Sequence, residues 1–344
     1  MIILGIDTSC DDTSGAVVED GRRVLSNVVH SQIKVHNPYG GVVPELASRE
    51  HLKNIVPVIR EALLRAGIEM GDLDGIAVTV GPGLVGSLLV GLYYAKALAY
   101  TQGIPLIAVN HLEGHILSIF LEDEIPSFPF VALTVSGGHT NLYKVNKYGD
   151  YVLMGQTLDD AAGEAFDKVA KVLGLGYPGG AVIENMANKG DKQRIGFPKA
   201  YLSNDSLDFS FSGLKTSVAL YVKKWRTASL QDEVTIADIA ASFQESVVDV
   251  LTHKTMLARE KAETFSVVVT GGVACNKRLR ARLSEAASKK DTRVYCPQPE
   301  FCTDNGAMIA IAGYHRLLNG EKAKLSIDVK SRYPISDLVH ARCR

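Results

Sequence analysis

The chain has 344 residues, of which 46% are hydrophobic and 22% are charged. This composition is typical of globular proteins and excludes a disordered or fibrous chain, and the length predicts two domains. With 37 basic and 38 acidic residues the formal charge is −1, which excludes a globally basic nucleic-acid coat but allows a local basic patch.

The cysteines and the N-terminus predict the compartment. Five cysteines without a CxxC pair indicate a reducing environment, no disulfide framework and no cysteine-based zinc knuckle; they are Cys10, Cys275, Cys296, Cys302 and Cys343. No basic segment precedes the short apolar run at the N-terminus, so no signal peptide is expected. Residues 75–95 are uncharged, but Gly81-Pro82-Gly83 divides them into a buried strand and a buried helix. We expect a soluble, cytoplasmic protein without a membrane segment.

The first part of the chain alternates strands and helices. Apolar residues 2–6 predict a strand, with 13–18 and 23–29 as its hairpin partners. Pro44 begins an amphipathic helix that ends near Gly67, and its apolar residues can serve the core or a dimer contact. A strand at 76–80, a helix at 84–102, a strand at 105–109 and a short helix from 111 follow.

A similar order of elements begins again near residue 127. It comprises strands at 130–135, 141–145 and 151–156, a helix at 159–173 with Asp159 or Asp160 as its N-cap, a strand at 267–270, and helices at about 274–288 and 304–318, the last capped by Thr303. Residues 174–213 are rich in glycine, serine and aromatic side chains, and we expect them to form ordered loops.

This repetition predicts an α/β fold that arose by internal duplication, with two mixed-sheet domains around a cleft. That is the plan of the actin, heat-shock ATPase and sugar-kinase superfamily. We expect an N-terminal domain at 1–110 that a C-terminal helix at about 303–325 completes, a second domain with the cleft loops at 111–302, and a tail at 326–344.

The segment HLEGH offers metal ligands. His111 and His115 are four residues apart, so both imidazoles lie on one face of a helix. Glu113 lies about 200° round that helix from His111, which separates the motif from the HExxH of metalloproteases. Two histidines with Asp304, at a later helix start, would suit Fe(II) or Zn(II) as a Lewis acid. The alternative is a pair of exposed or core histidines, because spacing alone does not bring Asp304 near.

Four turns rich in small residues can bind a nucleotide. They are residues 7–12, 134–140, 176–180 and 271–276. Glycine lets backbone N–H groups approach a ligand, and a following helix N-terminus favours anions. Neither a Walker A motif nor a GxGxxG follows the first strand. Asp167 can accept a hydrogen bond from a ribose hydroxyl or pair with Lys171.

The sequence also contains two basic runs and one candidate nucleophile, Cys10. The densest basic run is Lys277, Arg278, Arg280 and Arg282 with Lys289, Lys290 and Arg293, and a second run, 223–226, contains the single Trp. Such runs are usually solvated faces, although one could bind RNA in a salt-sensitive way. Cys10 precedes two acids that should raise the pKa of its thiol, and there is no GxSxG elbow.

At this point the residues resemble a known family, the bacterial branch of the tRNA adenosine threonylcarbamoyltransferases, formerly called O-sialoglycoprotein endopeptidases. The similar segments are GIDTSCDDT at 5–13, YGGVVPELASREH at 39–51, GPGLVGSLLVG at 81–91, HLEGH at 111–115, VSGGHT at 135–140, DDAAGEAFDKVAK at 159–171, YPGG at 177–180, DFSFSGLKT at 208–216, GGVACN at 271–276 and CTDNGAMIA at 302–310.

The resemblance implies a set of site residues. His111, His115 and Asp304 would hold one divalent metal, with Fe(II) favoured and Zn(II) the alternative. A pocket for the adenylate or another ATP/AMP-type ligand would be lined by Thr134, Val135, Ser136, Gly137, Gly138, His139, Asp167, Gly180, Glu184 and Asn276. Asp11 is the candidate catalytic carboxylate. Relatives often have Glu at the position of Asp12, and some have Asp or an uncharged residue at that of Glu184.

The resemblance also implies the reaction and the partners. The threonylcarbamoyl group would pass from threonylcarbamoyl-AMP to N6 of adenosine 37 in tRNAs that read ANN codons. The partners would be an inactive homologue of the same fold and a small P-loop ATPase. The alternatives are a small-molecule kinase and a nucleotide-dependent scaffold on this fold, and a metalloprotease is the least favoured.

Overall fold

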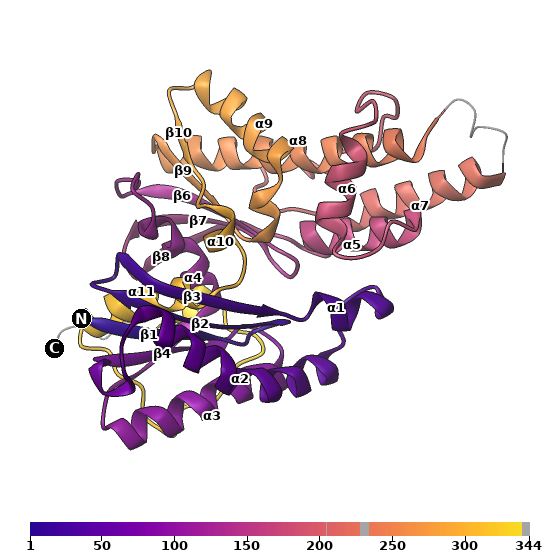
Figure 1. Cartoon of the computed structure of the whole chain (residues 1–344). Helices are drawn as coiled ribbons and strands as arrows, with labels where there is room; N and C mark the ends of the chain where they lie inside the picture. The colour runs from indigo at the N-terminus through magenta and orange to yellow at the C-terminus, as the bar shows by residue number, and fades with distance from the viewer. Residues whose placement is uncertain (204, 228–233, 339–344) are drawn as a thin grey trace. The chain divides into compact units, whose positions relative to one another are not determined.

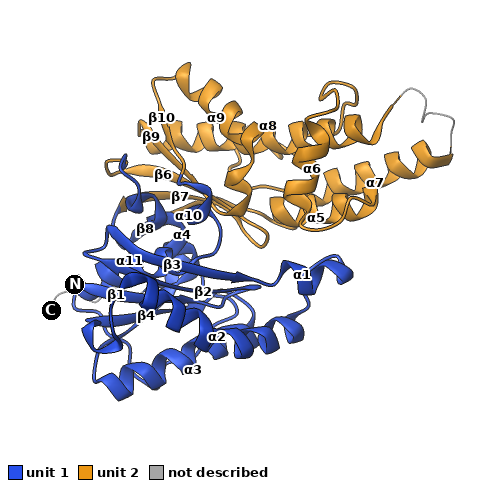
Figure 2. Cartoon of the chain, in the orientation of Figure 1, with its two compact units in different colours: residues 1–125, 147–151, 297–344 blue, residues 126–146, 152–296 orange. Residues whose placement is uncertain are grey.

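The structure is a computed structural model that describes residues 1–203, 205–227 and 234–338. It divides into two compact units, residues 1–125, 147–151 and 297–344, and residues 126–146 and 152–296 (Figure 2). The domain limits predicted at residues 110 and 302 stay predictions, and most of the predicted tail lies in the first unit. Cys343 lies outside the described residues, and the other cysteines are thiols.

The first unit is built on a five-stranded sheet in the order β3-β2-β1-β4-β5 (Figure 1). Its elements are β1 (Ile2–Asp7), β2 (Asp12–Glu19), β3 (Arg23–Ser31), α1 (Ile33–His36), α2 (Pro44–Ala66), β4 (Gly75–Gly81), α3 (Val85–Gln102), β5 (Leu106–Asn110), α4 (His111–Leu117), α10 (Pro299–Cys302) and α11 (Gly306–Leu318). The first three strands are antiparallel neighbours, and β1, β4 and β5 run parallel.

Helices cover both faces of this sheet. On one face, Ile55 and Ile59 of α2 and Leu92 of α3 join a buried cluster with alternate residues of β1 and β4. On the other face α11 packs directly against β1. A Cβ at Gly5 would lie only 2.1 Å from the carbonyl oxygen of Gly306, so the start of α11 can approach β1 because both positions are glycine. This close contact places the loop before α11 beside the end of β1.

The second unit repeats the topology. Its elements are β6 (Phe130–Val135), β7 (Thr140–Lys147), β8 (Asp150–Gln156), α5 (Ala162–Leu173), α6 (Gly179–Ala187), α7 (Ser212–Thr227), α8 (Ile236–Ala262), β9 (Ser266–Thr270), α9 (Lys277–Ser288) and β10 (Arg293–Tyr295). The sheet order β8-β7-β6-β9-β10 matches β3-β2-β1-β4-β5 strand for strand. The predicted duplicated, mixed-sheet α/β fold is confirmed. The tip of the β7–β8 hairpin, residues 147–151, belongs to the first unit.

Three predicted helix starts were wrong. Helix α5 begins at Ala162 with Ala161 as its N-cap, so neither Asp159 nor Asp160 caps it. Helices α9 and α11 begin after Asn276 and Asn305, whose side-chain oxygens accept hydrogen bonds from the backbone N–H three residues on. These asparagine caps, rather than Thr303 or the turn at 272–275, fix the two starts because their carbonyl oxygens satisfy otherwise unpaired N–H groups.

The prediction of loops at 174–213 was also wrong in part. Helix α6 begins after Pro178 and lies in the first part of that segment, and α7 begins at its end. The 27-residue helix α8, which was not predicted, is capped by Thr235 and Asp238 and lies among α6, α9 and β6 (Figure 1). Within the described residues, none of the helices combines the length and the apolar character that a membrane span requires.

Candidate metal centre and nucleotide turns

Helix α4 presents two histidines at the end of β5. Asn110 is the last residue of β5 and the N-cap of α4, because its Oδ1 accepts a hydrogen bond of 2.9 Å from the N–H of Leu112. The helix therefore begins at His111 with no intervening loop. His111 and His115 are both buried, and their ring centroids are 4.6 Å apart with the planes nearly perpendicular. The predicted one-face arrangement of the two imidazoles is present.

Asp304 meets both histidines from the loop before α11. Its Oδ1 lies 3.1 Å from Nε2 of His115 and 3.5 Å from Nε2 of His111. One ligand atom from each of the three residues lies within 4.8 Å of the other two. The fold thus brings together a distant carboxylate and two imidazoles, a ligand set that fits a divalent cation with coordination positions left for substrate.

The electrostatics of this group favour positive charge. Burial lowers the pKa of His111, but the carboxylates of Asp304 and Asp7 raise it by more, to about 9. Two acids in a buried setting therefore attract a cation to the imidazole. This setting favours a positive charge at the imidazole, whether a proton or a divalent metal supplies it.

The turn after β1 is acidic. Burial, and secondarily the charge of Asp304, raises the pKa of Asp11. Burial and the neighbouring Asp11 raise the pKa of Asp12 to about 7. Burial also raises the pKa of the Cys10 thiol well above its usual range, with Asp11 adding to the effect. The prediction of a blunted Cys10 is therefore confirmed, because a thiol with a raised pKa is a weak nucleophile at neutral pH.

One partner of the metal group was not predicted from the sequence. The Oγ of Ser9, in the turn after β1, lies 3.1 Å from Nδ1 of His111. The same hydroxyl donates a hydrogen bond to Asp7. In the sequence, Asp7 and Ser9 are recognisable only as members of the small-residue turn at 7–12. Their position could have indicated the contact. Both residues lie at the end of β1, and only β4 separates β1 in the sheet from β5, whose end leads into His111.

In the second unit the predicted nucleotide turn lies against the start of α5. The turn closes on itself, because the N–H of Ser136 donates to the carbonyl of His139 and the His139 N–H donates to Oγ of Ser136. The N–H of Gly163 donates to the carbonyl of Ser136, and a Cβ at Gly163 would lie 2.6 Å from that oxygen. Gly137 and Gly138 are exposed at the tip. The side chains of Thr134 and Val135 are buried in β6.

The other predicted pocket residues lie at neighbouring helix starts. Oδ1 of Asp167 accepts a hydrogen bond of 2.7 Å from the N–H of Gly179, where α6 begins beside Gly180. Oε1 of Glu184 accepts from the N–H of Lys277, and Asn276 both caps α9 and donates to Gln244. The side chains of Asp167, Glu184 and Asn276 thus already hold the helix starts in place. Space beside Gly180 is open, since an added Cβ there would meet no atom within 4 Å.

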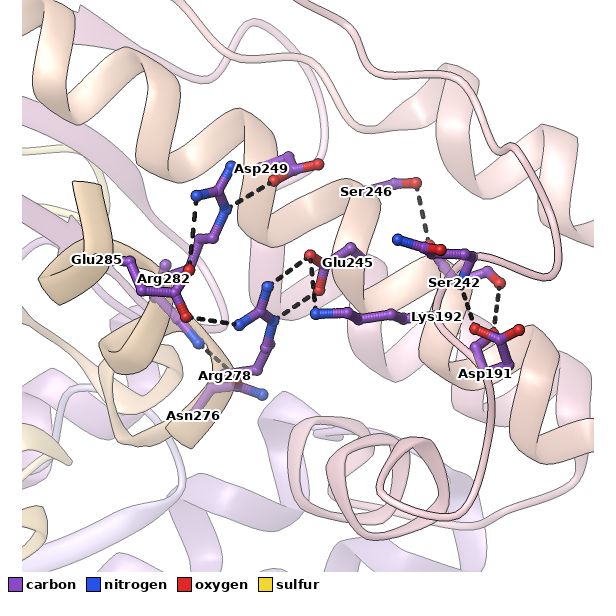
Figure 3. A network of polar contacts seen from close by, with 12 residues as sticks. Asp191, Lys192, Ser242, Glu245, Ser246, Asp249, Asn276, Arg278, Arg282 and Glu285 are labelled. Carbon is purple, nitrogen blue, oxygen red and sulfur yellow. Dashed lines mark hydrogen bonds and ion pairs between the residues drawn. The ribbon is translucent and has the colours of Figure 1, made fainter.

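Three residues of the basic run that begins in α9 form ion pairs within the second unit. Figure 3 shows Arg278 paired through two nitrogens with Glu245, at 2.7 Å each, and also with Glu285. Arg282 pairs with Asp249 and Glu285, and Lys290 pairs with Glu260. In the second run, Trp225 is buried and donates to the carbonyl of Val234. These ion pairs leave fewer basic groups for RNA than the sequence indicated.

The duplicated fold with a His–His–Asp group defines a class, the α/β proteins of ATPase-like fold. One solved structure with this fold is the activator of the 2-hydroxyisocaproyl-CoA dehydratase from Clostridium difficile with bound ADPNP. It is 14% identical, covers 93% of this chain and 97% of its own, and superposes with a TM-score of 0.53.

Sequence comparison then narrows the class to one family. Residues 23–311 match the family described as tRNA N6-adenosine threonylcarbamoyltransferase. Two curated proteins with that name, from Syntrophus aciditrophicus and Geotalea uraniireducens, are each 54% identical over 97% and 98% of this chain and 98% of their own length. The chain belongs to the tRNA N6-adenosine threonylcarbamoyltransferase family, as the sequence motifs predicted.

Proposed function

We propose that this chain transfers a threonylcarbamoyl group from threonylcarbamoyl-AMP to N6 of adenosine 37 in tRNAs that read ANN codons. The observation that carries the proposal is the convergence of His111, His115 and Asp304 in a chain of this family. A kinase on this fold would need carboxylates for Mg²⁺ rather than two imidazoles, so the ligand set favours the transferase over that alternative.

The three side chains would hold one divalent cation, with Fe(II) favoured and Zn(II) the alternative. Two imidazole nitrogens and one carboxylate oxygen suit either ion. When bound, the cation supplies Lewis-acid polarisation of the donor's carbonyl group. The chain's own contribution is to hold the donor in one orientation, which matters because the exocyclic amine of adenine is a poor nucleophile.

The glycine turns of the second unit would bind the AMP part of the donor. Their support is the exposed Gly137–Gly138 tip and the open N-terminus of α6 at Gly180, both of which offer backbone N–H groups to a phosphate. The ADPNP bound to the dehydratase activator supports a nucleotide site on this fold. With AMP as the leaving group, no covalent enzyme intermediate is required.

Asp11 would accept the proton that leaves N6 during the transfer. Its pKa lies above the usual range for an aspartate, which makes its carboxylate a better base near neutral pH. Burial and the charge of Asp304 are the causes. Substitution by Asn would preserve the size of the side chain and remove this basicity.

We also propose that the chain works in the cytoplasm with an inactive homologue of its own fold and a small P-loop ATPase. Helix α2 divides its apolar residues between core and surface. Ile55 and Ile59 are buried, whereas Leu52 and Leu64 are 65% and 75% exposed. On α3, Tyr100 is 74% exposed as well. These exposed apolar side chains support a helical contact surface for the homologous partner.

The test is to incubate the purified chain and its partners with threonylcarbamoyl-AMP and unmodified tRNA, and then to analyse the nucleosides by mass spectrometry. Wild-type protein should form the threonylcarbamoyl nucleoside. H111A should form none while it keeps its folded circular-dichroism spectrum. The control is H30A, which removes an exposed histidine of β3 and should retain activity. Full activity of metal-stripped H111A would contradict the assignment.

A further inference from the structure

Ser9 links a buried carboxylate to the metal-facing histidine. Its Oγ is 3.1 Å from Oδ2 of Asp7 and 3.1 Å from Nδ1 of His111. Asp7 is fully buried, and Ser9 and His111 are nearly so. Oδ1 of Asp7 has no hydrogen-bond partner among the described residues, and it lies 3.7 Å from Nδ1 of His111. Both carboxylate oxygens therefore lie on the Nδ1 side of the imidazole.

The single hydroxyl proton of Ser9 decides the direction of both hydrogen bonds. An ionised carboxylate only accepts, so the Ser9 hydroxyl must donate to Asp7. The Ser9 oxygen can then only accept from His111, which requires a proton on Nδ1. If Ser9 donated to the imidazole instead, its lone pairs would face a buried carboxylate, an arrangement that costs free energy.

A proton on Nδ1 leaves the lone pair of the neutral ring on Nε2. That nitrogen faces Oδ1 of Asp304 at 3.5 Å, on the side where Nε2 of His115 also lies. We propose that Asp7 and Ser9 are positioning residues that hold His111 in the tautomer whose Nε2 binds the metal. The inference rests on the metal centre of the proposed function. Metal-binding histidines generally depend on such a hydrogen bond from their other nitrogen.

The surroundings hold this relay rigid. Asp7 is the last residue of β1 and pairs with Ser14 of β2, whose Oγ donates to the backbone carbonyl of Asp7. Thr8 donates through its hydroxyl to the carbonyl of Ser87 in α3, which fixes the turn between Asp7 and Ser9. The side chains therefore meet His111 from a sheet end rather than from a free loop.

Ser14 supplies a matched control. S9A and S14A each remove one buried hydroxyl that bonds to Asp7, but only Ser9 reaches His111. We would measure the dissociation constant of Zn²⁺ for the metal-free full-length chain by competition with a chelator. S9A should bind Zn²⁺ about 10- to 100-fold more weakly than wild type. S14A should match wild type, and thermal unfolding would check that both variants fold.

A second readout concerns the ring itself. In ¹H–¹⁵N spectra of the zinc-loaded protein, His111 should carry a proton on Nδ1 and the metal on Nε2. Metal on Nδ1, or equal dissociation constants for S9A and S14A in a chain that binds Zn²⁺, would overturn this inference alone. Failure of the wild-type chain to bind Fe²⁺ or Zn²⁺ would overturn the metal centre of the proposed function, and this inference with it.

Discussion

Glu113 of α4 and Arg316 of α11 form a buried ion pair. Oε2 of Glu113 lies 2.7 Å from Nε of Arg316, and both side chains are buried. The other oxygen of Glu113 accepts a hydrogen bond from the hydroxyl of Tyr151. Arg316 also pairs with Glu321. The pair joins α4, which carries His111 and His115, to α11, which follows the loop with Asp304. Together with Tyr151, Arg316 occupies both oxygens of the glutamate in HLEGH.

This relationship explains why the motif is not that of a metalloprotease. A general base in such an enzyme must reach the metal-bound water, whereas both oxygens of Glu113 face Arg316 and Tyr151. The glutamate between the two histidines therefore has a structural role in this chain, because it joins α4 to α11.

We predict that E113Q destabilises the fold by about 3 kcal/mol, because it removes one of the two carboxylates that pair with the buried guanidinium of Arg316 and leaves only Glu321. The double variant E113Q/R316M should recover part of this loss, since it removes the uncompensated charge as well. Urea unfolding of wild type, both single variants and the double variant measures the coupling. Additive losses in the double variant would show that the pair does not act as a unit.

Asp304 should dominate metal affinity. D304A removes the one anionic ligand and leaves two neutral imidazoles, so the dissociation constant for Zn²⁺ should rise by more than the roughly 10- to 100-fold expected for an outer-shell partner. Calorimetric titration of metal-free protein measures this constant. D123A, which removes an exposed carboxylate of the same unit, is the control and should bind as wild type does. Unchanged affinity in D304A would exclude the residue as a ligand.

Two glycine substitutions should separate folding from nucleotide binding. In G163A the new Cβ would lie 2.6 Å from the carbonyl oxygen of Ser136, so the turn at 136–139 must shift, at a cost of about 1–3 kcal/mol. In G180A the Cβ meets no atom within 4 Å, and stability should change by less than about 0.5 kcal/mol.

Nucleotide binding should respond in both variants. G163A should weaken AMP binding because it moves the turn, and G180A should weaken it because its methyl group occupies the space beside the α6 N-terminus. Isothermal titration with AMP, alongside urea unfolding, gives both quantities. Wild-type affinity in G180A would place the phosphate elsewhere in the second unit.

His315 should make stability depend on pH. It lies on α11 with its ring stacked on Tyr148, the centroids 3.7 Å apart, and burial lowers its pKa to about 4. In the unfolded chain His315 binds a proton as the pH falls below about 6.5, whereas in the folded chain it does so only near pH 4. The contribution to stability is therefore complete above about pH 6.5 and is lost as the pH falls toward 4.

Partial exposure of the ring limits the size of this effect to about 1–2 kcal/mol. H315F should keep the stack and lose less stability between pH 7 and pH 4.5 than wild type does. Chemical unfolding at several pH values measures the difference, and H30N, at an exposed site, should follow the wild-type curve. Parallel curves for H315F and wild type would rule out His315 as the source.

The sequence by itself determined where the buried strands lie and that His111 and His115 share one face of a helix. Continuous apolar, β-branched runs such as Val267–Thr270 predict buried strands because that signal lies within the run itself. The four-residue spacing of His111 and His115 placed both rings on one helical face in the same way. Helix α8 was not predicted from the sequence. Apolar residues lie on most of its sides, which weakens the 3.6-residue periodicity of hydrophobic and polar positions that indicates a helix.

Only the tertiary structure decided which distant groups meet. The approach of Asp304 to the histidines depends on how α11 packs against β1, and the contact of Ser9 with His111 depends on the parallel pairing of β1, β4 and β5. The ion pairs of Arg278 likewise depend on how α8 packs against α9. Periodicity reports which face a residue occupies, whereas sheet register and helix packing fix what that face contacts.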